Sequence, residues 1–141
     1  MRMYTGDENE YPHTISGDDT HHSHALLGAF HIIAPAASAA IQALDRDDTV
    51  GFHAILDPTV PLSRHVFGPP TFYYKTGVVF MAYLNGYQSH FRMVHGLESA
   101  RSVVHLADQF RLADSVGLFD DPELATARMA AFLSTAGIDQ G

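Results

Sequence analysis

Lys75 is the side chain of this sequence with the most obvious chemical potential, because it is the only lysine and stands among aromatic residues at positions 73–76. A lysine amine can attack a carbonyl group and form a Schiff base when burial or a neighbouring cation lowers its pKa. The alternative is a structural lysine whose aliphatic stem packs on aromatic rings while its charged tip reaches water. We interpret Lys75 as structural.

Three histidines form a second candidate site at His21, His22 and His24. A His-x-His pair on a strand places two imidazoles on one face, as zinc or iron binding requires. The sequence shows no acidic partner for them at metal-site spacing. We therefore favour a polar loop over a metal site, and we expect neither a metal nor any other cofactor.

Two short strands and a series of helices must position these residues. The apolar run Ala25–Phe30 predicts a buried strand of the parallel type, and Arg2–Tyr4 predicts a first strand. A short helix at Glu10–Ser16, with Pro12 in its first turn, completes a βαβ unit. The remaining elements are predicted helices at residues 32–45, 47–67, 71–84, 99–116 and 121–136.

Proline and glycine mark the limits of these helices. Pro58 and Pro61 each remove a backbone donor and predict a break within residues 47–67. Asp121 followed by Pro122 is a strong helix start, because an aspartate cap precedes a proline at the first helical position. The helix at 71–84 is apolar almost all round, which predicts burial on most sides.

The composition excludes several classes of protein. The chain has 141 residues, 46% of them hydrophobic and 17% charged, with a formal net charge of −8 and no cysteine. An acidic chain is a poor general partner for nucleic acid or anionic membranes, so we expect neither. The lack of disulfides is typical of the cytoplasm, which is the predicted location.

A pair of parallel strands cannot form a stable sheet alone, because such sheets need neighbours and helices on both faces. The order of elements is that of the end of a (β/α)₈ barrel followed by a helical extension. The predicted fold class is α/β and mostly helical. We divide it into residues 1–46, the last two βα units of a partial barrel, and residues 47–141, the helical extension.

Particular segments carry a resemblance to a known family. They are Ile55–Phe67, Pro70–Gly77, Gly96–Ser102 and Asp121–Ala125. Together they resemble the C-terminal part of the DUF993 family, which is related to dihydrodipicolinate synthase and N-acetylneuraminate lyase. The resemblance implies a barrel that cleaves or forms a carbon–carbon bond of a 2-keto acid through a lysine Schiff base. In that superfamily the lysine lies on strand six, which has no counterpart in this chain.

The same resemblance assigns residues 2–6 to strand seven of the barrel and residues 25–29 to strand eight. Barrel active sites lie at the C-terminal ends of the strands. The resemblance therefore implies substrate-binding roles for Gly6, Asp7, Leu27 and Gly28, and no catalytic residue in this chain. The alternative interpretation of these positions is a tight turn and a helix start.

The predicted function is that of a C-terminal fragment of a lyase, inactive alone, whose substrate is bound only in a complete barrel. Its partner is the N-terminal barrel portion or further copies of itself. The alternative is a non-catalytic helical module that associates through the aromatic surface of residues 72–87. Arg64 and Arg101 are suited to binding a carboxylate or, in the interpretation we favour, to fixing helix ends or forming subunit contacts.

Overall fold

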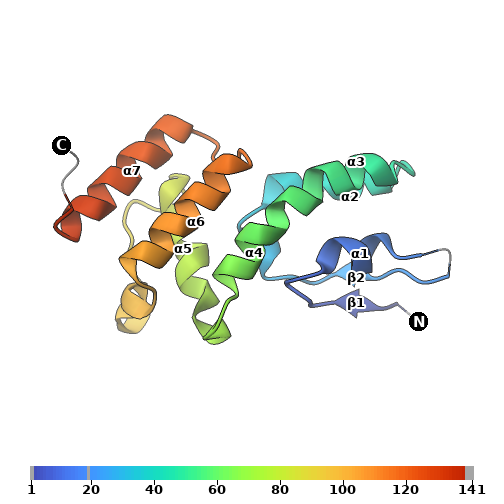
Figure 1. The fold of residues 1–141 in the computed structure, drawn as a ribbon, viewed down its shortest axis with the longest axis horizontal. Helices are drawn as coiled ribbons and strands as arrows, with labels where there is room; N and C mark the ends of the chain where they lie inside the picture. Colours follow the sequence, from blue (N-terminus) through green and yellow to red (C-terminus); the bar gives the residue numbers. More distant parts are fainter. Residues whose placement is uncertain (1, 19, 139–141) are drawn as a thin grey trace. The chain divides into compact units, whose positions relative to one another are not determined.

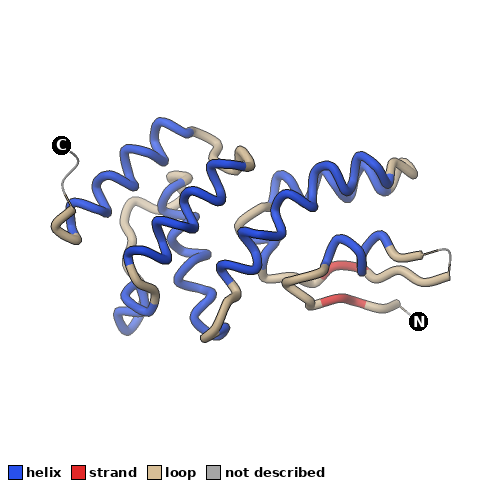
Figure 2. Tube along the Cα trace, in the orientation of Figure 1, coloured by secondary structure: helices blue, strands red, loops and turns tan. Residues whose placement is uncertain are grey.

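The computed structural model describes residues 2–18 and 20–138 and divides into two compact units, with the division between Arg64 and His65 (Figure 1). Most of the described residues are helical, as predicted, and the regular strands are confined to the first unit (Figure 2). None of the described helices is long and apolar enough to cross a membrane. The predicted division at residue 46 falls inside the first unit and remains a prediction.

The first unit contains the predicted parallel strand pair. Strand β1 (Tyr4–Thr5) pairs with β2 (His24–Ala25), with Tyr4 opposite His24 and Thr5 opposite Ala25. Helix α1 (Tyr11–Ser16) connects them, and proline occupies its first turn as predicted. The connection is therefore a short βαβ unit.

The second strand is shorter than the sequence predicts. Residues 26–30 do not continue β2; a 3₁₀ turn, η1 (Ala29–His31), begins there instead. The reason is a tertiary contact, because the Glu8 carboxylate accepts hydrogen bonds from the amides of Gly28 and Ala29 at 2.7 and 2.9 Å. Those amides are thereby held in a turn that ends the strand.

Helices α2 (Ala34–Leu44) and α3 (Thr49–Leu56) pack against each other, and α3 also contacts α1, which in turn contacts both strands. The buried residues of α2 are the alanines at positions 37, 40 and 43, and such small side chains let two helices approach closely. Asp48 caps α3 by accepting from the Gly51 amide at 2.8 Å. The predicted break is the 3₁₀ turn η2 (Asp57–Thr59), after which α4 (Val60–Val66) begins.

The second unit is helical. After the 3₁₀ turn η3 (Thr71–Tyr73), α5 (Tyr74–Leu84) contacts both α6 (Val103–Ser115) and α7 (Pro122–Thr135). Phe80, Met81 and Leu84 of α5 are buried, as the apolar pattern predicts. Helix α6 begins four residues later than predicted, because residues 94–100 form a separate 3₁₀ segment, η4 (Val94–Ala100), with positive φ angles at His95 and Gly96. Helix α7 begins at the predicted cap, where Asp121 accepts from the Leu124 amide at 3.0 Å.

Candidate functional site

The C-terminal ends of the two strands form the first candidate site, and Glu8 holds them together. Its side chain accepts from the amides of Gly28 and Ala29, while its main-chain carbonyl accepts from the Ser63 hydroxyl at 2.7 Å. A carboxylate at the first amides of a helical turn is electrostatically favourable. Glu8 therefore joins the segment after β1 to the segment after β2 and to α4.

Asp7 has a local role at this edge. Its carboxylate accepts from the Asn9 amide at 2.9 Å, and its own amide donates to the Thr5 hydroxyl at 3.2 Å. These bonds form a turn in which the exposed carboxylate keeps lone pairs that can accept from a ligand. The adjacent acids Asp7 and Glu8 thus act separately, one shaping the turn and one joining the two strand ends.

The four predicted substrate-binding residues lie in the segments that follow β1 and β2, and they differ in solvent exposure. Gly6 is exposed, and a Cβ atom at Gly6 would lie 3.8 Å from the Leu26 carbonyl oxygen, so the two strand ends run close together. Gly28 is half-buried beside Glu8, whereas the Leu27 side chain is only 7% exposed and belongs to the core. Gly6, Asp7 and Gly28 therefore offer backbone and carboxylate groups at the surface of this edge.

Tyr11 lies beneath this edge and was not among the sequence candidates. Its side chain is fully buried, its hydroxyl is 2.7 Å from the Thr59 hydroxyl, and Thr59 donates in turn to the Leu56 carbonyl at 2.7 Å. Tyr11 is therefore the donor to Thr59. Burial raises the pKa of the Tyr11 phenol, and the Thr59 hydrogen bond opposes this change. Tyr11 thus serves as a neutral, structural anchor.

The histidine cluster has no metal-binding geometry. Among residues 2–18 and 20–138, no three His, Asp or Glu side chains converge on a point where they could hold a metal ion. The rings of His22 and His24 are 5.9 Å apart, and His21 Nδ1 is 2.7 Å from the Thr20 hydroxyl. His21 and His22 therefore lie in a polar loop, whereas His24 belongs to strand β2.

Lys75 is exposed at the second residue of α5. Schiff-base chemistry at neutral pH needs an amine whose pKa is lowered by burial or by a nearby cation. An exposed lysine at a helix start lacks the first of these conditions. The structural interpretation of Lys75 is therefore the better supported one.

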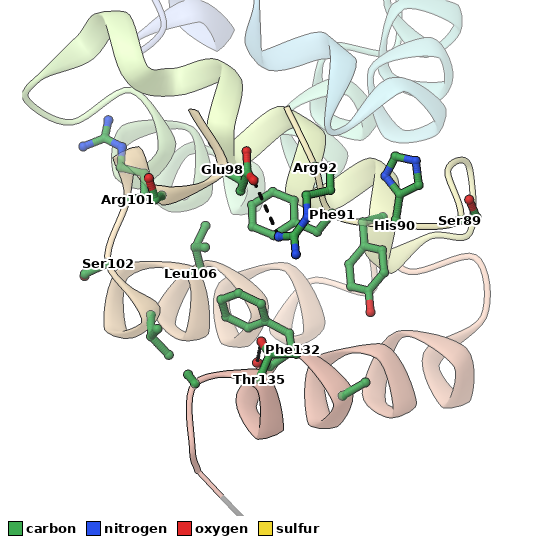
Figure 3. A pocket seen from close by; sticks show the side chains of 15 residues that line it. Ser89, His90, Phe91, Arg92, Glu98, Arg101, Ser102, Leu106, Phe132 and Thr135 are labelled. Atoms are coloured by element: carbon green, nitrogen blue, oxygen red, sulfur yellow. Dashed lines mark hydrogen bonds and ion pairs between the residues drawn. The ribbon is translucent and has the colours of Figure 1, made fainter. Parts of the chain in front are cut away.

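The second unit has a cleft of about 690 Å³ (Figure 3). Phe91, Phe132 and Leu106 give it an apolar floor. Glu98 and Arg92 lie at its rim, 3.5 Å apart, and Figure 3 marks this pair. Hydrogen bonds from the amides of Glu98 itself and Met93 lower the pKa of the Glu98 carboxyl, so this group is a carboxylate at neutral pH.

Arg101 also lines this cleft, but its guanidinium is engaged elsewhere. It donates to the carbonyl oxygens of Val66, Gly68, Pro69 and Pro70 at 3.2, 2.7, 3.2 and 3.2 Å. Arg101 therefore fixes the end of α4 and the segment that follows, which is the helix-end role predicted from sequence. In the first unit, Arg64 bonds the Asn9 carbonyl and the Glu10 carboxylate in the same manner.

The fold and these two surfaces define a mostly helical protein in which one short βαβ unit precedes a helical bundle. Residues 1–138 match the family described as "Protein of unknown function (DUF993)". The chain therefore belongs to the DUF993 family. A comparison with curated proteins gives no match.

Proposed function

We propose that this chain forms the end of a (β/α)₈ barrel of the dihydrodipicolinate synthase kind. The complete barrel would cleave or form a carbon–carbon bond of a 2-keto acid through a lysine Schiff base. The chain would contribute the last two strand ends and the helical extension, and it is inactive alone. The observation that carries this proposal is the incomplete sheet of the first unit.

The strand pair has an apolar surface without cover among the described residues. Strands β1 and β2 have two residues each and pair with one another. Met3, Tyr4 and Leu26 are 56%, 57% and 76% exposed. Because parallel sheets are normally covered on both faces and continued by further strands, this surface fits neighbouring barrel strands.

The positions of the strand ends and of Lys75 support this proposal. The segments that follow β1 and β2 meet at one edge through Glu8, and substrates of barrel enzymes bind at that edge. Lys75 belongs to α5 of the second unit and is exposed. In this proposal the catalytic amine comes from the missing strands, while Gly6, Asp7 and Gly28 contact the substrate.

A reconstitution experiment tests the proposal. The chain is mixed with a polypeptide that carries the first six βα units of a longer family member, and binding is measured by sedimentation. We expect a one-to-one complex that Tyr4→Asp and Leu26→Asp weaken at least tenfold. Val104→Asp is the matched control, because Val104 is 70% exposed on α6 of the second unit.

The same mixture is then treated with pyruvate and sodium borohydride and analysed by mass spectrometry. The expected covalent adduct is on a lysine of the six-strand segment and forms only in the complex. An adduct on Lys75 of the chain alone would overturn the proposal. The proposal would also be overturned if the chain does not bind the segment. Binding that Tyr4→Asp leaves unchanged would overturn it as well.

The alternative, a non-catalytic module that forms homo-oligomers, has one supporting observation. Phe72 and Tyr87, at the two ends of the predicted aromatic surface, are 73% and 67% exposed. Most of the aromatic side chains between them pack within the second unit. Sedimentation equilibrium of the chain alone distinguishes the barrel proposal from the module proposal. Oligomers that dissociate in the Phe72→Asp variant but persist in the Tyr4→Asp variant would favour the module. A compact monomer would count against it.

A further inference from the structure

Three side chains of the first unit form a hydrogen-bonded line that is independent of the proposed lyase chemistry. His53 lies on α3, and its Nδ1 is 2.9 Å from Asp57 Oδ1, one helical turn further along. The other ring nitrogen, Nε2, is 3.2 Å from the hydroxyl of Ser16 at the end of α1. The order of groups is hydroxyl, imidazole, carboxylate.

The chemistry of these groups sets the direction of the hydrogen bonds. An ionised carboxylate only accepts, so Asp57 holds the ring proton of His53 on Nδ1. The neutral ring then presents Nε2 as an acceptor within reach of the Ser16 hydroxyl, whose other acceptor is the His13 carbonyl at 3.4 Å. This arrangement activates a serine as a nucleophile, since the imidazole can take the hydroxyl proton. The His53 and Asp57 side chains are 26% and 49% exposed, so solvent reaches the site.

A hollow of about 330 Å³ follows α1 along the chain; Gly17 lines it, whereas Ser16, His53 and Asp57 do not. Among the residues that the structure describes, the titratable groups that line this hollow are His13, Asp18, His21 and His22. Hydrogen bonds from the Thr20 hydroxyl and from nearby amides lower the pKa of Asp18, which is therefore anionic at neutral pH. A carboxylate two residues from Ser16 in the sequence disfavours anionic substrates, so the substrates considered are small neutral esters.

We propose that Ser16 is a nucleophile toward small neutral esters, with His53 as its general base and Asp57 as the residue that orients His53. The Ser16 oxygen bonds to the ester carbonyl carbon while its proton moves to Nε2 of His53. The carbon–oxygen bond of the leaving alcohol then breaks, and the alcohol takes the proton from His53. Water hydrolyses the acyl-serine by the same route, which releases the acid and restores Ser16.

The neighbouring amides predict that this reaction is slow. The Gly17 amide donates to the His13 carbonyl at 2.9 Å, and the Asp18 amide donates to the His21 carbonyl at 2.9 Å. Neither is therefore free to stabilise the developing oxyanion, and such donors supply a large part of the rate in serine hydrolases. We expect acylation to be detectable and turnover to be low.

The test is covalent labelling of the full chain with a fluorophosphonate and with p-nitrophenyl acetate, with the labelled residue assigned by tandem mass spectrometry. Ser115 is the matched internal control. It also ends a helix and donates to the carbonyl three residues before it, at 2.8 Å. We expect Ser16 to be labelled at least ten times faster than Ser115.

Variants of the relay separate chemistry from folding. His53→Gln should lower the labelling rate of Ser16 about a hundredfold, the lower limit for loss of a general base. Asp57→Asn retains the size of the side chain and should lower the rate at least tenfold. Circular dichroism confirms that each variant is folded. Equal labelling of Ser16 and Ser115, or a rate unchanged in both variants, would overturn the proposal.

Discussion

Single side chains stabilise the second unit by bonding to main-chain carbonyl groups of distant segments. Arg101 donates to four carbonyls between Val66 and Pro70. Gln109, fully buried on α6, donates to the Gly77 carbonyl at 2.8 Å. Thr76 donates to the Leu97 carbonyl at 2.8 Å. Because unpaired carbonyls are costly to bury, the bonds from Arg101 and Thr76 determine how the loops lie against the helices, and the bond from Gln109 joins α6 to α5.

Arg101→Lys should destabilise the protein although the charge is retained. A lysine ammonium is compact and cannot reach the separated carbonyls that the planar guanidinium spans. We expect a loss of about 2 kcal/mol in the free energy of unfolding, from carbonyls left without a donor. Urea unfolding measures it, with Arg111→Lys as the control because Arg111 forms an exposed pair with Asp108. Equal effects at both positions would contradict this role.

His105 should make the protein less stable in acid. Burial, and then the neighbouring His65 and Arg101 charges, lower the pKa of His105 from 6.5 to about 4. The rings of His65 and His105 stack with centroids 3.9 Å apart. Between these two pH values the unfolded chain binds a proton at His105 that the folded chain does not bind. The free energy of unfolding therefore falls as the pH falls from 6.5 toward 4.

The measurement compares urea unfolding of the wild type and His105→Gln at pH 7.5 and pH 4.5. Between pH 7.5 and pH 4.5 the His105→Gln variant should lose less free energy of unfolding than the wild type, because it lacks the imidazole whose pKa is lowered. An NMR titration of the His105 ring measures its pKa directly. A titration midpoint near 6.5 in the folded protein would contradict the assignment.

At the scale of elements, close helix contacts depend on small residues and on caps. A Cβ atom at Gly77 of α5 would lie 2.7 Å from Gln109 Oε1 and 3.0 Å from Val66 Cγ1. Helix α5 can therefore approach its neighbours because position 77 has no side chain. The caps at Ser102 and Asp121, which accept from the amides of His105 and Leu124, set where α6 and α7 begin.

Gly77→Ala should reverse the usual effect of this substitution. In an exposed helix interior, alanine is more favourable than glycine by roughly 0.5–1 kcal/mol. Here the methyl group would overpack the contact with α6, and we expect a loss of about 1–3 kcal/mol in the free energy of unfolding. The loss should shrink in the Gln109→Ala background, which removes the nearest atom. A stabilised single variant, measured by urea unfolding, would refute this account.

At the scale of the whole molecule, the chain consists of two compact units, each with buried apolar side chains. Tyr11, Ile33 and Phe52 belong to the core of the first unit, and Phe80 and Leu106 to that of the second. Glu8 is the principal polar connection within the first unit, since it joins the two strand ends and α4. Loss of Glu8 should therefore act on the segments of the first unit that it joins.

Glu8→Ala should loosen the first unit selectively. Loss of the carboxylate frees the Gly28 and Ala29 amides, so hydrogen exchange of peptides covering residues 24–31 should increase at least tenfold. Peptides covering 103–135 should be unchanged. Glu123→Ala, in the first turn of α7, is the control and should leave residues 24–31 unaffected. A comparable increase in both units after Glu8→Ala would show that they unfold together.

The local signals of the sequence predicted the elements well where they were strong. Pro35 and Pro122 lie in the first turns of helices, and the break at Pro58 is the turn η2. The apolar run at 25–30 was misinterpreted as strand throughout, because nothing in its periodicity reveals the bond from Glu8. A contact between residues 20 positions apart depends on the tertiary fold.

The sequence by itself determined the DUF993 resemblance, the helical character, the caps and the parallel strand pair, because propensity and periodicity act between residues close along the chain. Only the tertiary structure decided which side chains meet. It placed Glu8 against Gly28, exposed Lys75, committed Arg101 to carbonyl groups, and aligned Ser16 with His53, 37 residues apart. These contacts join segments distant in sequence, and packing of the cores determines which of them form.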